Sequence, residues 1–158
     1  MRNVFFPDEE ITRDDLYFVC YMIERTARQL KQPNRYVVNK MGKRELAERL
    51  SMASVQHAEN PDAVAQHWID DNELTSGNHD VLKTDTQLVQ APPTALQMGK
   101  VYARLIEQTI SENEDYADAI QRVYNSPICE ILDDYNGSAY YEPSYVIARS
   151  YYHGNFNY

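Results

Sequence analysis

Apolar residues recur every three or four positions over most of the chain, which is the spacing of one face of an α-helix. The clearest case follows Thr12, a good N-cap, where two aspartates in the first turn suit the positive end of a helix dipole. Phe18 and Met22 add a second apolar stripe, and a helix that is apolar on two sides is usually buried. The pattern therefore predicts a central core helix over 13–31. Its main stripe consists of Leu16, Val19, Cys20, Ile23, Ala27 and Leu30.

The same spacing predicts further helices, and several have clear start or stop signals. Gly42 ends a short helix that begins at Asn34. Asn60-Pro61 provides an N-cap followed by proline at the first helical position. No strand-like alternation stands out, so we predict an all-α fold: an irregular multi-helix bundle of about six to eight helices with little or no sheet. The longer helices after the first are expected at 43–57, 61–71, 95–111 and 114–125, with shorter ones after Pro127 and Pro143.

Residues 72–94 interrupt the helical pattern. They contain a Ser-Gly-Asn turn, a Pro-Pro pair and few apolar residues. Connections of this length inside a compact domain are uncommon unless they are functional or join two units. We therefore predict an N-terminal helical unit over 12–71, a long connection over 72–94 and a C-terminal helical unit over 95–154, packed together as one compact domain.

The composition agrees with a globular core. The chain has 158 residues, of which 43% are hydrophobic and 25% charged, so it is too apolar for a disordered protein. Nine residues on the apolar faces are expected to be largely buried. They are Val19, Ile23, Leu46, Leu50, Trp68, Val101, Leu105, Ile120 and Ile131.

Charge is distributed unevenly along the chain. Residues 1–49 carry ten Lys/Arg and eight Asp/Glu, whereas residues 50–158 carry five and sixteen, for a net charge of −9. The basic excess forms a candidate basic patch, unless these residues belong to an ordinary solvated helix face. Residues 43–50 resemble the first helix of a helix-turn-helix, but Asn60-Pro61 stops the helix that would enter a groove, and an acidic molecule disfavours phosphate binding. The basic residues are Arg25, Arg28, Lys31, Arg35, Lys40, Lys43, Arg44 and Arg49.

Few residues suggest chemistry. Cys129 falls in the first turn of a predicted helix, where a dipole can lower a thiol pKa, but no general base accompanies it in the sequence. His67 and Asp71 lie four apart on one helical face, which is far fewer ligands than a metal site needs. We therefore predict no catalytic residue, no metal site and no cofactor, and we expect Cys20 and Cys129 to be buried and reduced.

Tyrosines concentrate at the end of the chain. Residues 135–158 hold seven of the thirteen tyrosines. Tyrosine combines a large apolar ring with a polar tip and is enriched at interfaces, so the segment suits a contact surface, although the same rings would also complete a small core. The candidate interface residues are Tyr140, Tyr141, Tyr145, Tyr151, Tyr152 and Phe156.

The sequence also suggests where the protein works. The N-terminal residues lack the apolar run of a signal peptide, and no stretch of about 18 apolar residues offers a membrane span. Two cysteines do not make the disulfide framework of a small secreted protein. We expect a cytoplasmic protein that does not bind membranes.

Residues 16–71 resemble an uncharacterised bacterial domain-of-unknown-function family of short helical proteins. The resemblance rests on 18–24, on Val37-Val38 and Met41-Gly42, and on positions up to Ile69-Asp70 that include Leu46, Leu50, Val55 and His57. It implies a bacterial helical protein whose relatives lie beside toxin-like genes, and hence a partner-binding or neutralising role. The chain after Asn72 has no counterpart in that resemblance.

Three hypotheses about function follow from the sequence. The first is a non-enzymatic protein that binds a protein partner or itself through the C-terminal tyrosines, with the acidic body setting selectivity, possible partners including a toxin-like protein. The second is a small enzyme or ligand-binding protein with a pocket between the two helical halves, covered by the 72–94 connection. The third is a nucleic-acid-associated regulator that uses the basic 25–49 region.

Overall fold

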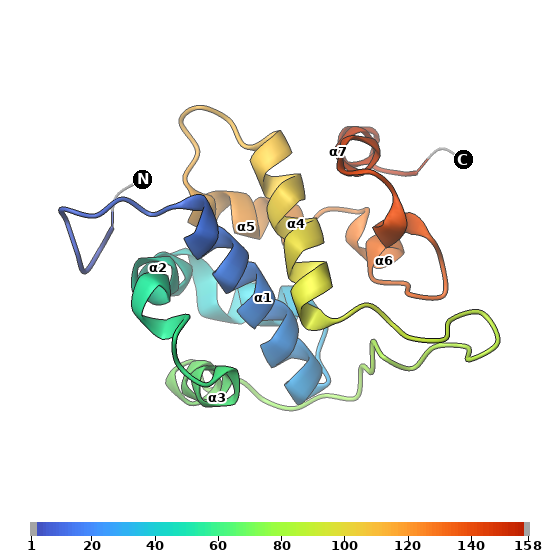
Figure 1. Ribbon diagram of the computed structural model, residues 1–158, viewed down its shortest axis with the longest axis horizontal. Helices are drawn as coiled ribbons and strands as arrows, with labels where there is room; N and C mark the ends of the chain where they lie inside the picture. The colour runs from blue at the N-terminus through green and yellow to red at the C-terminus, as the bar shows by residue number, and fades with distance from the viewer. Residues whose placement is uncertain (1–2, 157–158) are drawn as a thin grey trace.

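The computed structural model describes residues 3–156 and confirms the all-α prediction, since this part of the chain forms no β-strand. Figure 1 shows the helices gathered around α1, with the two ends of the chain on opposite sides. The elements are α1 (Arg13–Leu30), α2 (Asn34–Gln56), α3 (Pro61–Asp71), α4 (Ala95–Thr109), α5 (Tyr116–Tyr124), α6 (Cys129–Leu132), the 3₁₀ helix η1 (Ala139–Tyr141) and α7 (Ser144–His153).

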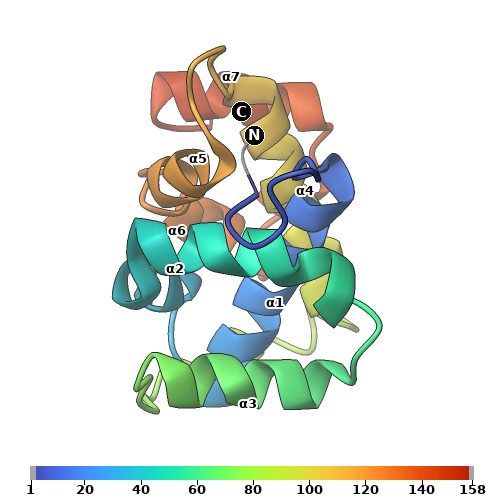
Figure 2. The same ribbon diagram turned by 90° about the vertical axis from the view of Figure 1, so that its left-hand side faces the viewer.

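Helix α1 is the central element of the bundle. A capping box starts it, in which the Asp15 amide donates to the Thr12 hydroxyl over 3.3 Å and the Thr12 amide donates to the Asp15 carboxylate over 2.7 Å. Helices α2, α3 and α4 all pack against α1, and α2 crosses in front of it in Figure 2. Leu16, Val19 and Ile23 are fully buried there, as expected of a helix that is apolar on two sides.

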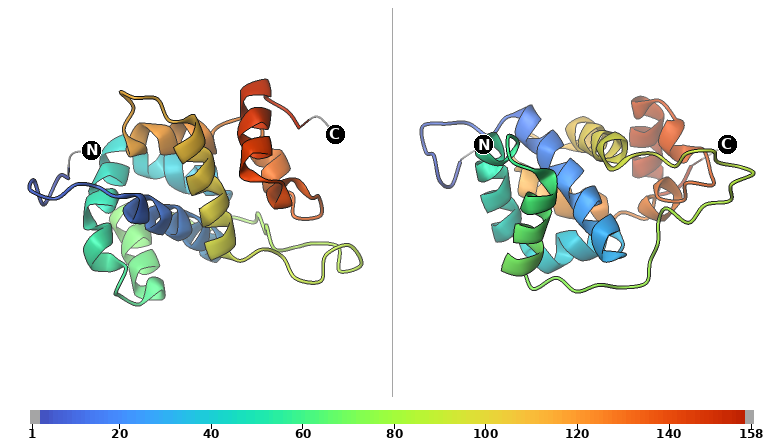
Figure 3. Two further views of the ribbon diagram at one scale, coloured as in Figure 1. Left: turned by 45° about the horizontal axis from the view of Figure 1, so that its top comes forward. Right: turned by 60° about the horizontal axis from the view of Figure 1, so that its bottom comes forward.

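Helix α4 lies close to α1 because its contact residue is a glycine. A Cβ atom added to Gly99 would lie 2.7 Å from the Tyr21 Cα, so any larger residue requires the two helices to move apart. On its other side α4 contacts α7, so α4 separates α1 from the C-terminal helix (Figure 3).

Helix α2 consists of two helical stretches that meet at Gly42. This residue has φ 78° and ψ 173°, a backbone conformation that glycine adopts without the steric cost of a Cβ. The sequence correctly placed a break between a short helix and a longer one at this residue. The break lets the second stretch change direction and bring Leu46 and Leu50 into the core.

The long connection runs without regular structure from α3 to α4, and Figure 1 shows it extending beyond the helices. Its first part is fixed to the end of α1, because the Gly77 amide donates to the Leu30 carbonyl over 2.8 Å and the His79 amide donates to the Lys31 carbonyl over 2.9 Å. Further along, the Asp85 amide donates to the Asn136 side chain over 2.7 Å. The connection is thus hydrogen-bonded both to the C-terminal end of α1 and to the segment after α6.

Most of the expected core is observed. Seven of the nine residues are buried, and Val101 and Ile131 are only partly buried. Val101 differs from the prediction because its face of α4 lines a surface hollow beside Tyr140 and Tyr141 instead of the core. Among the buried side chains, Tyr102 and Tyr124 stack with their ring centroids 4.2 Å apart.

Candidate functional site

The C-terminal tyrosines divide into buried and exposed groups. Tyr135 and Tyr140 belong to the core and are 2% and 7% exposed, and Phe156 is also buried at 7%. Tyr151 is partly buried, and its hydroxyl accepts a 2.7 Å hydrogen bond from Arg122. The exposed candidates are therefore Tyr141, Tyr145 and Tyr152, which are 74%, 67% and 69% exposed.

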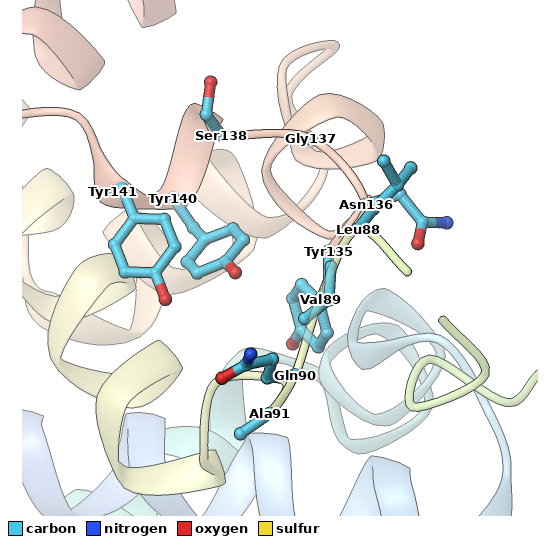
Figure 4. Close-up of a pocket in the computed structure, with 10 residues that line it drawn as sticks. All are labelled: Leu88, Val89, Gln90, Ala91, Tyr135, Asn136, Gly137, Ser138, Tyr140 and Tyr141. Atoms are coloured by element: carbon cyan, nitrogen blue, oxygen red, sulfur yellow. The ribbon is translucent and has the colours of Figure 1, made fainter. Parts of the chain in front are cut away.

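A surface groove of about 600 Å³ lies between the long connection and the segment after α6. In Figure 4 the rings of Tyr140 and Tyr141 lie beside each other, and the Tyr135 ring overlaps the segment of residues 88–91. We call this hollow the tyrosine groove. It is lined by Leu88, Val89, Gln90, Ala91, Tyr135, Asn136, Gly137, Ser138, Tyr140 and Tyr141.

Tyr140 and Tyr141 form a ridge between two hollows. Their ring centroids are 4.3 Å apart, and both rings also line a second hollow of about 200 Å³ against α4 and the start of α7. Burial together with the neighbouring Tyr141 raises the pKa of Tyr140 to about 12, so its hydroxyl keeps its proton at neutral pH. Tyr140 is buried and forms the base of the ridge. Tyr141 is exposed and forms its solvent-facing edge.

The two segments that form the groove are acidic. Residues 80–91 and 130–142 contain a single basic residue, Lys83, and six carboxylate side chains. Among the residues that line the groove none is charged, so the acidic residues of these two segments lie outside its lining. The acidic residues are Asp80, Asp85, Glu130, Asp133, Asp134 and Glu142.

A carboxyl pair that the sequence patterns do not predict lies near Tyr135 of the groove. Glu24 of α1 is 3% exposed, and Asp133 follows α6 and is partly buried. The side-chain amide of Asn34 joins them, donating to Glu24 Oε1 over 2.9 Å and to Asp133 Oδ2 over 3.1 Å. The Tyr102 hydroxyl donates to Asp133 Oδ1 over 2.8 Å. Within the described chain neither carboxyl group forms an ion pair.

The surroundings of this pair favour protonated carboxyl groups. Burial, and then the nearby Asp133 charge, raises the pKa of Glu24 to about 8 against the weaker opposing effect of the Asn34 hydrogen bond. Burial likewise raises the pKa of Asp133 to about 7, although the bonds from Tyr102 and Asn34 favour its ionised form. At neutral pH a proton is therefore held within the pair.

One arginine links the carboxyl pair to the tyrosine groove. Arg28 lies one helical turn after Glu24, and its Nη2 donates to the Tyr135 hydroxyl over 2.9 Å. Its guanidinium carbon also lies over the Tyr135 ring, 5.5 Å from the centroid. Tyr135 thus lines the groove with its ring and reaches Arg28 through its hydroxyl.

A single sequence did contain a signal for this cluster. Glu24 lies among the apolar positions that form the two stripes of the first helix. An unpaired carboxylate is costly to bury at such a position. Its partners Asn34 and Asp133 are distant in sequence, and only the fold brings them to the same place.

The basic residues of 25–49 do not form a continuous free patch. Arg28 donates a hydrogen bond to Tyr135. Arg49 is 9% exposed and forms ion pairs with Glu45 and Asp71. Lys31 and Lys40 are exposed. The other four pair with acidic side chains: Arg25 with Asp62, Arg35 with Glu130, Lys43 with Asp115 and Asp118, and Arg44 with Glu48. Much of the positive charge predicted to face a partner is therefore neutralised within the chain.

Neither cysteine is arranged for nucleophilic chemistry. Both are free and buried, and burial raises the pKa of Cys20 to about 12 and of Cys129 to about 11. The Cys129 thiol donates to the Val123 carbonyl over 3.0 Å, and α6 has only four residues, so burial outweighs any helix-dipole effect. Residues 3–156 bring together no group of three or more His, Cys, Asp or Glu side chains that could hold a metal ion.

No protein-family model, curated protein or solved structure matches this chain. The resemblance of residues 16–71 to an uncharacterised bacterial family therefore stays a prediction. None of the helices within 3–156 has both the length and the apolar character needed to cross a membrane.

Proposed function

We propose that this protein is a non-enzymatic binding protein whose tyrosine groove takes up an extended, basic segment of a partner protein. The observation that carries the proposal is the groove itself, a hollow of about 600 Å³ edged by exposed Tyr141 and by Leu88, which is 69% exposed. Aromatic anchors that are already held in place reduce the entropy lost on binding. Here Tyr140 and Tyr135 are buried and support the groove from below.

Charge complementarity supports a basic partner. Besides the partly buried Asp133, five carboxylates on the two groove segments, against one lysine, favour the approach of lysine and arginine side chains. Tyrosine faces also attract cations, at about 0.5–1 kcal/mol for an exposed contact. Acidic peptides and nucleic acids would meet repulsion at the same surface.

The composition of the groove favours binding over catalysis. Its lining residues include no Asp, Glu, His, Cys, Lys or Arg, so Ser138 has no general base beside it there. The second hypothesis from the sequence placed a ligand pocket under the 72–94 connection, and residues 88–91 of that connection do line the groove. The hollow is open to solvent, which suits an extended chain segment better than an enclosed small molecule. The resemblance over 16–71 adds a toxin-like protein as one candidate partner.

Selection from a random 12-residue peptide library tests the proposal. The peptides that bind the full chain should be enriched in Lys and Arg, and Tyr141→Ala should weaken their affinity at least tenfold, as loss of a hot-spot aromatic does. Tyr141 is 74% exposed, so its truncation leaves the core intact.

Tyr152→Ala is the matched control, because Tyr152 is 69% exposed but does not line the groove. It should change affinity less than twofold. Enrichment of neutral or acidic peptides, or equal effects of the two substitutions, would contradict the proposal. If the chain forms a dimer and Tyr141→Ala dissociates it, the partner is a second copy of this chain and not a foreign protein.

A further inference from the structure

We propose that Glu24 and Asp133 share a proton that keeps Arg28 on Tyr135, so that loss of this proton loosens the tyrosine groove and makes partner binding sensitive to pH. The proposal rests on the proposed function for its biological role. Its structural part concerns this chain alone and is tested separately.

The geometry of the pair is unfavourable for two negative charges. One amide group, that of Asn34, donates to both carboxyl groups at 2.9 and 3.1 Å. As far as the described residues extend, no lysine, arginine or histidine forms an ion pair with either carboxyl group. Two buried like charges around one neutral bridge repel each other strongly, so one proton between them is the stable arrangement near neutral pH.

The long connection also covers the carboxyl pair on one side. A cavity of only about 10 Å³, about the size of one water molecule, lies beside it, and His79 and Val81 of the long connection close that cavity. The amide of His79 is held by the Lys31 carbonyl, so this cover is fixed to the end of α1.

Arg28 faces two competing partners. It now donates to the neutral Tyr135 hydroxyl over 2.9 Å, and it lies one turn from Glu24 and beside the same small cavity as both carboxyl groups. A hydrogen bond to an ionised carboxylate is about twice as strong as one to a neutral group. A second negative charge on the pair therefore draws Arg28 away from Tyr135, and the ring that lines the groove loses its anchor.

Other titratable and charged side chains surround the pair. Tyr102, Tyr124 and Tyr135 have pKa values raised by burial, as do Cys20 and Cys129, so these groups stay neutral through the relevant range. The positive charges of Arg28 and Arg35 favour ionised Asp133. His79 lines the cavity but is an exposed residue. The pKa values of Glu24 and Asp133, about 8 and about 7, place the change between pH 7 and 8.

Carboxyl-carbon and tyrosine-ring NMR signals, followed from pH 5 to 9, test the structural part without any partner. In the full chain we expect the Glu24 and Asp133 signals to titrate near pH 7–8 and the Tyr135 ring signals to move with the same midpoint. Glu24→Gln should abolish the movement of the Tyr135 signals, and Asp133→Asn provides a second variant if the first does not fold. Carboxyl titration near pH 4, or Tyr135 signals that do not follow the pair, would overturn the inference.

Glu107→Gln is the matched control. Glu107 also accepts a hydrogen bond from a tyrosine, Tyr17, over 2.7 Å, but Arg13 neutralises it at 2.9 Å. This substitution should leave the Tyr135 titration unchanged.

The affinity of a selected basic peptide, measured at pH 6 and pH 9, tests the coupling to the groove. We expect affinity to fall at least fivefold at pH 9 in the wild type and less than twofold in Glu24→Gln. The sign is decisive, because extra negative charge alone would strengthen the binding of a basic peptide, so a rise would overturn the inference. If no peptide binds at all, the proposed function fails while the NMR titration still decides the proton-sharing part.

Discussion

Glu24 lies on a buried face of α1 beside Ile23 and Ala27, and no cation among the described residues forms an ion pair with it. Such residues are costly for stability and concentrate at sites with a function. Here the cost is reduced by a proton and by the Asn34 amide. A folded-state pKa above the unfolded value gives stability that is fully present below about pH 4 and is lost as pH rises through the folded value.

Wild-type protein should therefore lose stability steadily as pH rises from about 4, the unfolded-state pKa of a carboxyl group, and level off above the raised folded-state pKa values of about 7 and about 8. Glu24→Gln, which cannot ionise, should flatten this dependence and exceed the wild type by at least about 1 kcal/mol at pH 9, since one pKa unit corresponds to about 1.4 kcal/mol. Urea denaturation across pH measures both curves. Parallel curves for the two proteins would show that Glu24 is not protonated in the fold.

Pairs of helices show what local patterns predict and what they do not. The break at Gly42 and the start of α3 at Asn60-Pro61 come from neighbouring residues, so the sequence predicts them well. The approach of α4 to α1 at Gly99 depends on Tyr21, which is 78 positions away, and no local pattern reports it. The same holds for Asn34 with Asp133, and for residues 88–91 facing 135–141 across the groove.

Gly99→Ala should destabilise the fold by about 1–3 kcal/mol, because the new Cβ would lie 2.7 Å from backbone atoms of Tyr21. In a helix without that contact the same change gains up to about 1 kcal/mol from helix propensity. The sign of the change in unfolding free energy is thus the test. A stabilised variant would show that α1 and α4 are further apart than the structure places them.

At the scale of the whole molecule, the C-terminal tyrosines divide between the core and the surface. Tyr135 and Tyr140 complete the core, while Tyr141, Tyr145 and Tyr152 remain at the surface. The sequence could not sort them, because alternation between core and surface within 135–152 depends on where α6, η1 and α7 meet α4 and the long connection. In the proposed function, buried aromatic rings support the exposed ones from below, and the acidic groove segments favour basic partners.

Hydrogen–deuterium exchange of the full chain, with and without a selected basic peptide, tests the central claim most directly. We predict that the peptide slows exchange in 135–141 and in 88–91 together, because these two segments form the groove and are far apart in the sequence. Exchange at α3, which lies away from the groove, should stay unchanged. Protection confined to α1–α3, or to one groove segment alone, would contradict the account.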